Sequence, residues 1–167
     1  MKYLLSTLLA LLFLGCSQPH PPLKTVERVE IEKYLGVWYE IARYEHFFEK
    51  GCSDVSATYT KRDDGEINVL NSCTKEGEIT TAKGIAYATD ASNAKLKVSF
   101  FRPFYGDYQI LMLGENYEYA VIGEPSREYF WILSRTKKLD EKTTKKILHT
   151  MPTLGYDESK LIWTPQH

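Results

Sequence analysis

The most reactive side chains of the sequence are its three cysteines, Cys16, Cys52 and Cys73. His46 lies a short distance before Cys52 and could act as a general base for a cysteine nucleophile. Such a pair also needs a third group that orients the histidine, and the sequence offers no evident candidate for that role. We therefore favour structural roles for the cysteines over catalysis.

Cys16 lies at the end of an apparent export signal. Lys2 is followed by an apolar run over residues 3–14 and then by Gly15. The run is too short to span a membrane, which takes about 20 apolar residues, and it is typical of a secretory signal peptide. The letters LFLGC resemble the lipobox of bacterial lipoproteins, whose cysteine carries the lipid. We expect residues 1–15 to be a lipoprotein signal peptide and residues 16–29 a lipidated N-terminus and tether. The alternative is a plain signal peptide with an unmodified Cys16, which also exports the chain.

The charge balance argues against a nucleic-acid partner. Loss of residues 1–15 removes Lys2 from the 21 basic residues and none of the 22 acidic ones, so the mature chain stays slightly acidic. Nucleic-acid binding usually needs a basic surface. The remaining chain of about 150 residues is long enough for one domain with a sizeable core, which we place at residues 30–167.

Cys52 and Cys73 are expected to form a disulfide, because an exported chain meets an oxidising compartment. Residues 55–61 and 67–73 both alternate between apolar and polar side chains, and RDDG at residues 62–65 has the composition of a hairpin turn. Pairing the strands about this turn places Cys52 within about two residues of the position opposite Cys73, which is close enough for a bridge.

The rest of the chain favours β-structure. Together with the first hairpin, the strand candidates are residues 36–44, 80–88, 95–101, 105–113, 117–123 and 128–134, separated by turn-forming clusters. Short strands joined by tight turns predict an all-β fold, an eight-stranded antiparallel up-and-down β-barrel that can enclose one small ligand. One helix is expected after the N-cap Asp140, with an apolar side that packs outside the barrel. Residues 161–164 are a candidate for a short last strand.

Three short motifs identify a family. Gly36-Val37-Trp38 resembles the first lipocalin motif, GDY at residues 106–108 falls where the second is usual, and Arg135 after WILS occupies the third. The sequence is similar to bacterial lipocalins of the outer-membrane lipoprotein group, the group nearest apolipoprotein D, over about residues 30–164. The resemblance implies the lipocalin calyx, in which Gly36, Trp38 and Arg135 are structural, with the arginine across the indole. It also puts Phe47 and Phe48 at the open end, where they either cap the local core or meet an apolar ligand or membrane.

The alternation of side chains along strands, together with the family pattern, predicts which residues line the cavity. The expected ligand-binding residues are Ala57, Tyr59, Val69, Asn71, Ile85, Tyr87, Leu96, Val98, Phe100, Gln109, Leu111, Tyr129 and Trp131. Such a cavity is mainly apolar and suits a long apolar molecule with one polar end. The alternative is a barrel filled completely by its own side chains.

The resemblance implies a non-enzymatic protein that binds, stores or transports a fatty acid or lysophospholipid at the bacterial outer membrane. A lipid-modifying enzyme is the first alternative, although the expected wall contains no Cys, His, Asp or Glu for acid–base chemistry. A tetrapyrrole carrier is the second, but none of the four histidines lies in an expected strand, and we expect no cofactor and no metal. The oligomeric state is left open, with a homodimer among the options.

Overall fold

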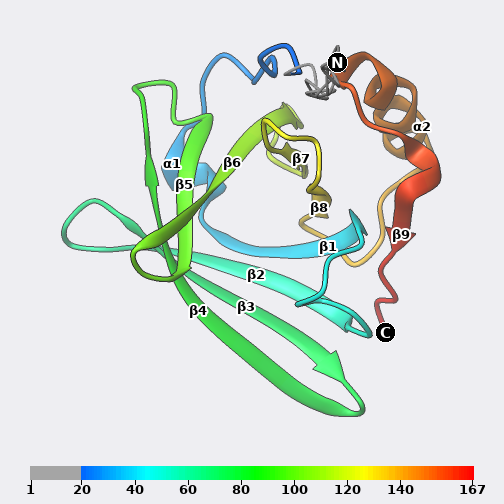
Figure 1. Ribbon diagram of the computed structural model, residues 1–167, viewed down its shortest axis with the longest axis horizontal. Helices are drawn as coiled ribbons and strands as arrows, with labels where there is room; N and C mark the ends of the chain where they lie inside the picture. Colours follow the sequence, from blue (N-terminus) through cyan, green and yellow to red (C-terminus); the bar gives the residue numbers. More distant parts are fainter. Residues whose placement is uncertain (1–19) are drawn as a thin grey trace, which may run out of the picture.

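The computed structural model describes residues 20–167, so Cys16 and the expected signal peptide lie outside the described residues. Strands encircle a central space in Figure 1. The strands are β1 (Gly36–Tyr44), β2 (Ser53–Lys61), β3 (Ile67–Lys75), β4 (Glu78–Ala88), β5 (Lys95–Phe101), β6 (Phe104–Leu113), β7 (Tyr119–Gly123), β8 (Phe130–Ser134) and β9 (Leu161–Trp163). Neighbours in the chain pair antiparallel from β2 to β8, and β1 pairs with both β8 and β2, which closes the barrel. The predicted eight-stranded barrel is confirmed, and β9 adds a ninth strand beside β1.

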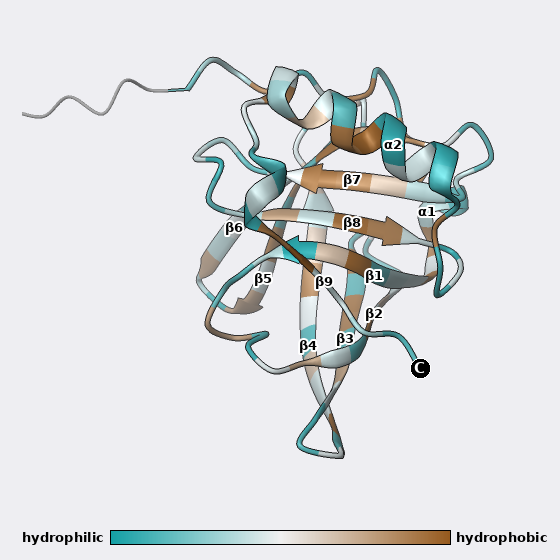
Figure 2. Ribbon diagram, turned by 90° about the vertical axis from the view of Figure 1, so that its right-hand side faces the viewer, coloured by the Kyte–Doolittle hydropathy of each residue, from teal (hydrophilic) through white to brown (hydrophobic). Residues whose placement is uncertain are grey.

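The main helix, α2 (Glu141–Thr150), begins as the sequence predicts. The Thr143 amide donates to the Asp140 carboxylate over 2.9 Å, which is the expected N-cap. Ile147 and Met151 are fully buried against the outer side of β7 and β8, and Figure 2 shows the helix lying along these strands. The structure adds the short helices α1 (Ile31–Tyr34), η1 (Met151–Leu154) and η2 (Glu158–Lys160). Helices of one turn are too short to carry an apolar periodicity, so the sequence did not indicate them.

The antiparallel order gives the barrel two different ends. At the closed end lie the connections at residues 62–66, 89–94 and 114–118, together with α1. At the open end lie the connections at residues 45–52, 76–77, 102–103 and 124–129. No helix within residues 20–167 is long and apolar enough to cross a membrane.

The segment that precedes α1 runs along the barrel. Pro21 accepts a hydrogen bond from Arg127 at the open end, and the amide of Val29 donates to Ser92 at the closed end over 2.8 Å. Leu23 and Val29 are buried. Part of the stretch that the sequence assigns to the tether therefore packs against the domain.

The barrel has a seam between β1 and β2. These strands pair only from Gly36 to Tyr39 on the β1 side, and β1 then turns to β9. The segment 164–167 fills the gap, because Gln166 Nε2 donates to the carbonyls of both Glu40 and Val55 over 2.8 Å. The amide of Asp54 donates to the Pro165 carbonyl beside it.

Candidate functional site: an apolar cavity with a sealed floor

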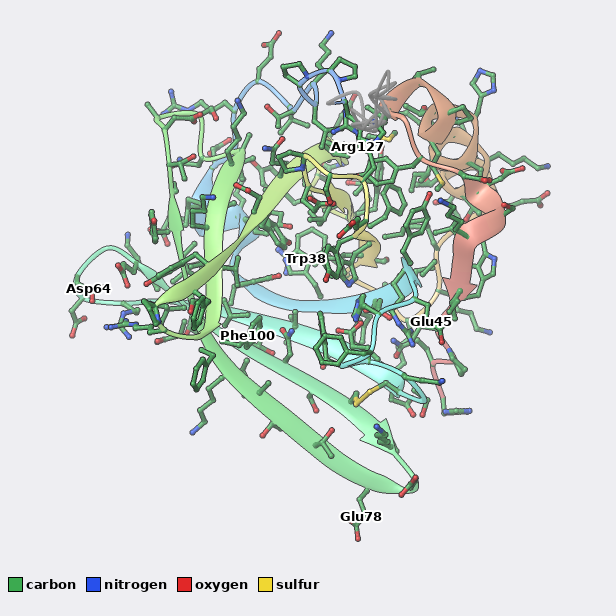
Figure 3. All side chains as sticks on the ribbon, in the orientation of Figure 1. Trp38, Glu45, Asp64, Glu78, Phe100 and Arg127 are labelled. Atoms are coloured by element: carbon green, nitrogen blue, oxygen red, sulfur yellow. A yellow bond between two sulfur atoms is a disulfide. The ribbon has the colours of Figure 1, made fainter. Side chains whose placement is uncertain are left out.

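Trp38 seals the closed end of the barrel. The side chain is fully buried, and its indole nitrogen donates to the Tyr34 carbonyl over 2.8 Å. The Arg135 guanidinium lies over the ring at 3.8 Å from the centroid and also donates to the carbonyls of Val37 and Lys33. Gly36 has a φ of +95°, a backbone conformation that glycine adopts without strain. The structure therefore contains the tryptophan–arginine contact that the resemblance implies, and Figure 3 shows Trp38 inside the ring of strands.

Three tyrosines form a layer above Trp38. The Tyr108 hydroxyl lies 2.7 Å from that of Tyr34 and 3.1 Å from that of Tyr59, so the three hydroxyl groups satisfy one another. Burial raises the pKa of Tyr59 to about 12 and raises those of Tyr34 and Tyr108 as well, so all three stay neutral at physiological pH. Tyr59 and Tyr108 face the space above and form its floor.

That space is a cavity of about 740 Å³ in the open half of the barrel. Its wall is mainly aliphatic and aromatic, and it extends to loop residues at the open end. The alternative of a barrel filled completely by its own side chains is therefore wrong. Eight of the expected wall residues line the cavity, namely Ala57, Tyr59, Val69, Asn71, Val98, Phe100, Tyr129 and Trp131. Leu96 also points inward, but it packs in the core around Trp38 at the closed end.

Two of the misplaced wall residues are on β4. Ile85 and Tyr87 were expected inside, whereas the register pairs the inward residues Ile67 and Val69 with Ala86 and Gly84. Small residues occupy the inner face of β4 because a neighbouring strand fills the space. A Cβ on Gly84 would lie 2.9 Å from the Phe100 ring. The bulky side chains of β4 are consequently on the outside.

Gln109 and Leu111 on β6 were also expected inside, and this too is wrong. Tyr108 lines the cavity and Ile110 lies in the inner core, whereas Leu111 packs in the outer cluster that contains α2. The pairing register shifts on both sides of β6, between Val98 and Phe101 and between Ile110 and Met112. Between these shifts the register is regular and pairs Tyr108 with the inward Leu96 and Gln109 with Lys95, so the inward residues of β6 there are Tyr108 and Ile110.

The expectation of a wall without acidic residues is also wrong, because four carboxylates line the cavity: Glu40, Glu49, Asp107 and Glu124. Asp107 forms an ion pair with Lys97, and the Glu124 carboxylate accepts hydrogen bonds from the backbone of its own loop. Glu40 and Glu49 belong instead to a buried polar cluster with Arg43, His46 and Thr164. The signal for Glu40 was in the sequence, because it lies two residues after the inward Trp38 on the same strand.

The buried polar cluster sits where β1 leaves β2. Arg43 donates to Glu40 over 2.9 Å and to Thr164 over 3.0 Å. Burial, with the nearby charge of Glu49, raises the pKa of Glu40 to about 8. Burial acts in the same direction on Glu49, but hydrogen bonding and charge from His46, Glu40 and Arg43 outweigh it and lower its pKa. Glu40 is therefore the carboxyl that holds a proton at neutral pH.

His46 is buried beside the cavity wall. Its ring stacks on Phe48 at 4.0 Å and lies 5.5 Å from the Trp131 ring. Nε2 is 3.2 Å from the Glu49 carboxylate and forms an ion pair with it when the ring is protonated, whereas Nδ1 has no hydrogen-bond partner. A second unpartnered polar atom, the side-chain oxygen of Asn71, lies in the wall itself. The open half of the barrel thus keeps unused hydrogen-bonding groups.

A disulfide fixes the loop that carries these groups. Cys52 and Cys73 are bonded, with 5.6 Å between their Cα atoms, which confirms the predicted bridge. The bond ties the end of the β1–β2 loop to β3. His46, Phe48 and Glu49 are therefore held on a loop that is covalently closed to the barrel wall.

A barrel sealed by tryptophan and arginine at one end, with an apolar cavity at the other, defines a lipocalin. The family model of the lipocalin-like domain matches residues 29–166, and the chain belongs to this family. Insecticyanin from the tobacco hornworm Manduca sexta has a similar fold, with a TM-score of 0.70 and 22% identity over 86% of this chain and 84% of that one.

Proteins of similar sequence show where the chain lies within the lipocalin family. Outer membrane lipoprotein Blc of Escherichia coli strain K12 is 43% identical, over 94% of this chain and 92% of the relative. Apolipoprotein D of the mouse, Mus musculus, is 32% identical, over 89% and 82%. The expected place in the family, among bacterial outer-membrane lipoproteins with a more distant similarity to apolipoprotein D, is confirmed. The bacterial relative's name agrees with the expected lipid-anchored location at the outer membrane.

Proposed function

We propose that this lipocalin binds the acyl chain of a fatty acid or lysophospholipid in its cavity and carries or stores the lipid unchanged. The observation that carries the proposal is the apolar cavity of about 740 Å³, because small-molecule sites measure roughly 300–1,000 Å³ and are mostly apolar. Val69, Val98 and Trp131 supply surface along which an acyl chain can lie.

The charges of the wall favour a lysophospholipid over a free fatty acid. Four carboxylates and no lysine or arginine are among the described residues that line the cavity. A fatty acid anion would find no ion pair there, whereas the hydroxyl or ammonium group of a lysophospholipid can donate to Asn71 or Glu49. We expect the lysophospholipid to bind more tightly at neutral pH.

Tryptophan emission tests the proposal. Trp131 lies in the cavity wall, whereas Trp38 is sealed below the floor and Trp163 is half exposed on β9. Titration of delipidated protein with an 18-carbon lysophospholipid should change the emission saturably, with a dissociation constant near micromolar, or about −8 kcal/mol. The Trp131→Phe variant should retain binding, measured by calorimetry, and lose most of the optical signal.

The same samples distinguish a carrier from an enzyme. Mass spectrometry of the lipid after incubation should return an unchanged mass. A changed lipid would favour the enzyme, since Glu40, Glu49 and His46 could then serve as acid–base groups. Absence of saturable binding by either lipid class would overturn the proposal altogether.

We also propose that Cys16 carries the membrane anchor after removal of residues 1–15. The lipobox-like letters before it and the lipoprotein relatives support this assignment. Cys16→Ala should move the protein from the membrane fraction to the soluble fraction of a bacterial envelope preparation. Retention of the variant in washed membranes would place the anchor elsewhere.

A further inference from the structure

The open end of the barrel exposes four phenylalanines. Phe47 and Phe48 on the β1–β2 loop are 85% and 53% exposed, and Phe101 and Phe104 at the β5–β6 turn are 76% and 71% exposed. All four belong to the rim of the cavity. Clustered apolar exposure of this kind usually marks an interaction surface.

The local core does not account for these side chains. Phe48 stacks on His46 and covers part of the buried polar cluster. Phe47 contacts Phe48 only edge to face, and Phe101 and Phe104 stack on each other at 6.3 Å, with most of their surface in solvent. Most of the apolar surface of Phe47, Phe101 and Phe104 therefore remains uncovered by the described residues.

The start of the described chain lies at this same end. Arg127, in the β7–β8 connection, donates a hydrogen bond to the Pro21 carbonyl over 2.6 Å. Pro21 is five positions after Cys16, and an extended chain of that length reaches at most about 18 Å. A strand the length of β6 spans roughly 30 Å, so an anchor at Cys16 stays near the open end.

We infer that the open end of the barrel docks on the phospholipid bilayer, with Phe47, Phe101 and Phe104 in the boundary between head groups and acyl chains. The inference rests on the proposed anchor at Cys16. The anchor and the phenylalanine rim then meet one membrane surface, and the closed end with Trp38 faces away from it. A lipid can pass between the bilayer and the cavity without crossing bulk water.

Charge does not drive this docking. The connections at the open end contain basic residues, but acidic residues offset them: Lys50, Arg102 and Arg127 are matched by Glu45, Glu49, Glu76, Glu124 and Glu128. A surface without net positive charge gains little from anionic lipids. The attraction is apolar, since each buried phenylalanine contributes to membrane affinity in proportion to its area.

Quenching by brominated phospholipid tests the orientation. The full-length lipidated protein is reconstituted into vesicles of phosphatidylethanolamine and phosphatidylglycerol that contain the brominated lipid. Phe101→Trp puts a reporter at the rim, and Glu115→Trp puts a matched reporter in the exposed β6–β7 connection at the closed end. The signal added at position 101 should be quenched at least twofold more than the signal added at position 115.

Two results overturn the inference: equal quenching at the two positions, or stronger quenching at position 115. The excess quenching at position 101 should persist when the salt is raised from 0.1 to 0.5 M. Its loss would also overturn the apolar docking, because only charge attraction is screened over that range. The outcome is independent of ligand binding. A protein that shows rim quenching but takes up no lipid in the titration above supports the docking and refutes the carrier proposal.

Discussion

The two ends of the barrel use similar aromatic side chains for opposite purposes. At the closed end, Trp38 and the three tyrosines are buried, and each polar atom that they carry has a partner. At the open end, phenylalanines are exposed, and His46 and Asn71 keep unpartnered polar atoms. The comparison indicates that fold stability is concentrated in the floor and binding capacity in the rim. Substitutions at the two ends should therefore separate stability from binding.

The largest effect is expected for Trp38→Ala. Removal of a fully buried indole leaves a cavity and should lower the free energy of unfolding by about 3–5 kcal/mol. Denaturant unfolding followed by circular dichroism measures the loss. Phe101→Ala is the matched control at the open end, and it should change the same quantity by less than about 0.5 kcal/mol. Similar losses for both variants would refute the division between the ends.

The disulfide should have the next largest effect. The bond closes a loop between residues 21 positions apart, so the double variant Cys52→Ala/Cys73→Ala should lose about 3 kcal/mol of unfolding free energy. Thiol counting under denaturing conditions without reductant should find neither cysteine reactive in the parent protein. An unchanged stability would show that the open end does not depend on this link.

A charge in the cavity should affect binding. Val98→Glu puts a carboxylate in the apolar wall, where it must stay unpaired or take up a proton, so lipid affinity should fall at least 100-fold. Gln109→Glu is the control, because the structure places Gln109 outside the cavity, and its affinity should remain within about twofold. Calorimetry measures both affinities. A large loss for Gln109→Glu with little loss for Val98→Glu would show that Gln109 faces the cavity, as the sequence predicted.

Per pH unit, the smallest effect is a pH dependence of stability that Glu40 causes. Its folded-state pKa of about 8 exceeds the ordinary value of 4.5, so the folded protein binds the extra proton between these values. This contribution to stability is fully present below about pH 4.5 and is lost as the pH rises through about 8, with a slope of at most about 1.4 kcal/mol per pH unit. Glu40→Gln should remove that part of the slope in urea unfolding measured from pH 5 to 9. An identical slope in both proteins would show that Glu40 is charged throughout.

The sequence was sufficient for the parts of the molecule that follow a local rule. Strand alternation and turn composition predicted the barrel, the hairpin placed Cys52 near Cys73, and the N-cap located α2. Parity also worked along β8: the resemblance fixed the direction of Arg135, and the inward positions of Trp131 and Tyr129 followed from the alternation. These predictions succeeded because neighbouring residues alone determine the outcome.

The failures have a common physical cause. The inner face of β4 depends on Phe100 from the next strand, which leaves room only for Gly84 and Ala86. The face of β6 depends on its register against β5, which pairs Tyr108 with the inward Leu96. The inward faces of β4 and β6 are both set by packing between strands. A single sequence shows that side chains alternate, but it does not show which of the two alternating sets points inward.

The seam between β1 and β2 has a consequence for the order in which the protein can form. Gln166, whose side-chain amide bridges these two strands, is 126 residues away from Glu40 in the chain. Strands β1 and β2 can pair directly over Gly36 to Tyr39, but the bridge between Glu40 and Val55 cannot form until the segment after α2 is in place. Contacts between such distant residues also form slowly. The seam beside β1, the first strand of the chain, is thus the last part of the barrel to close.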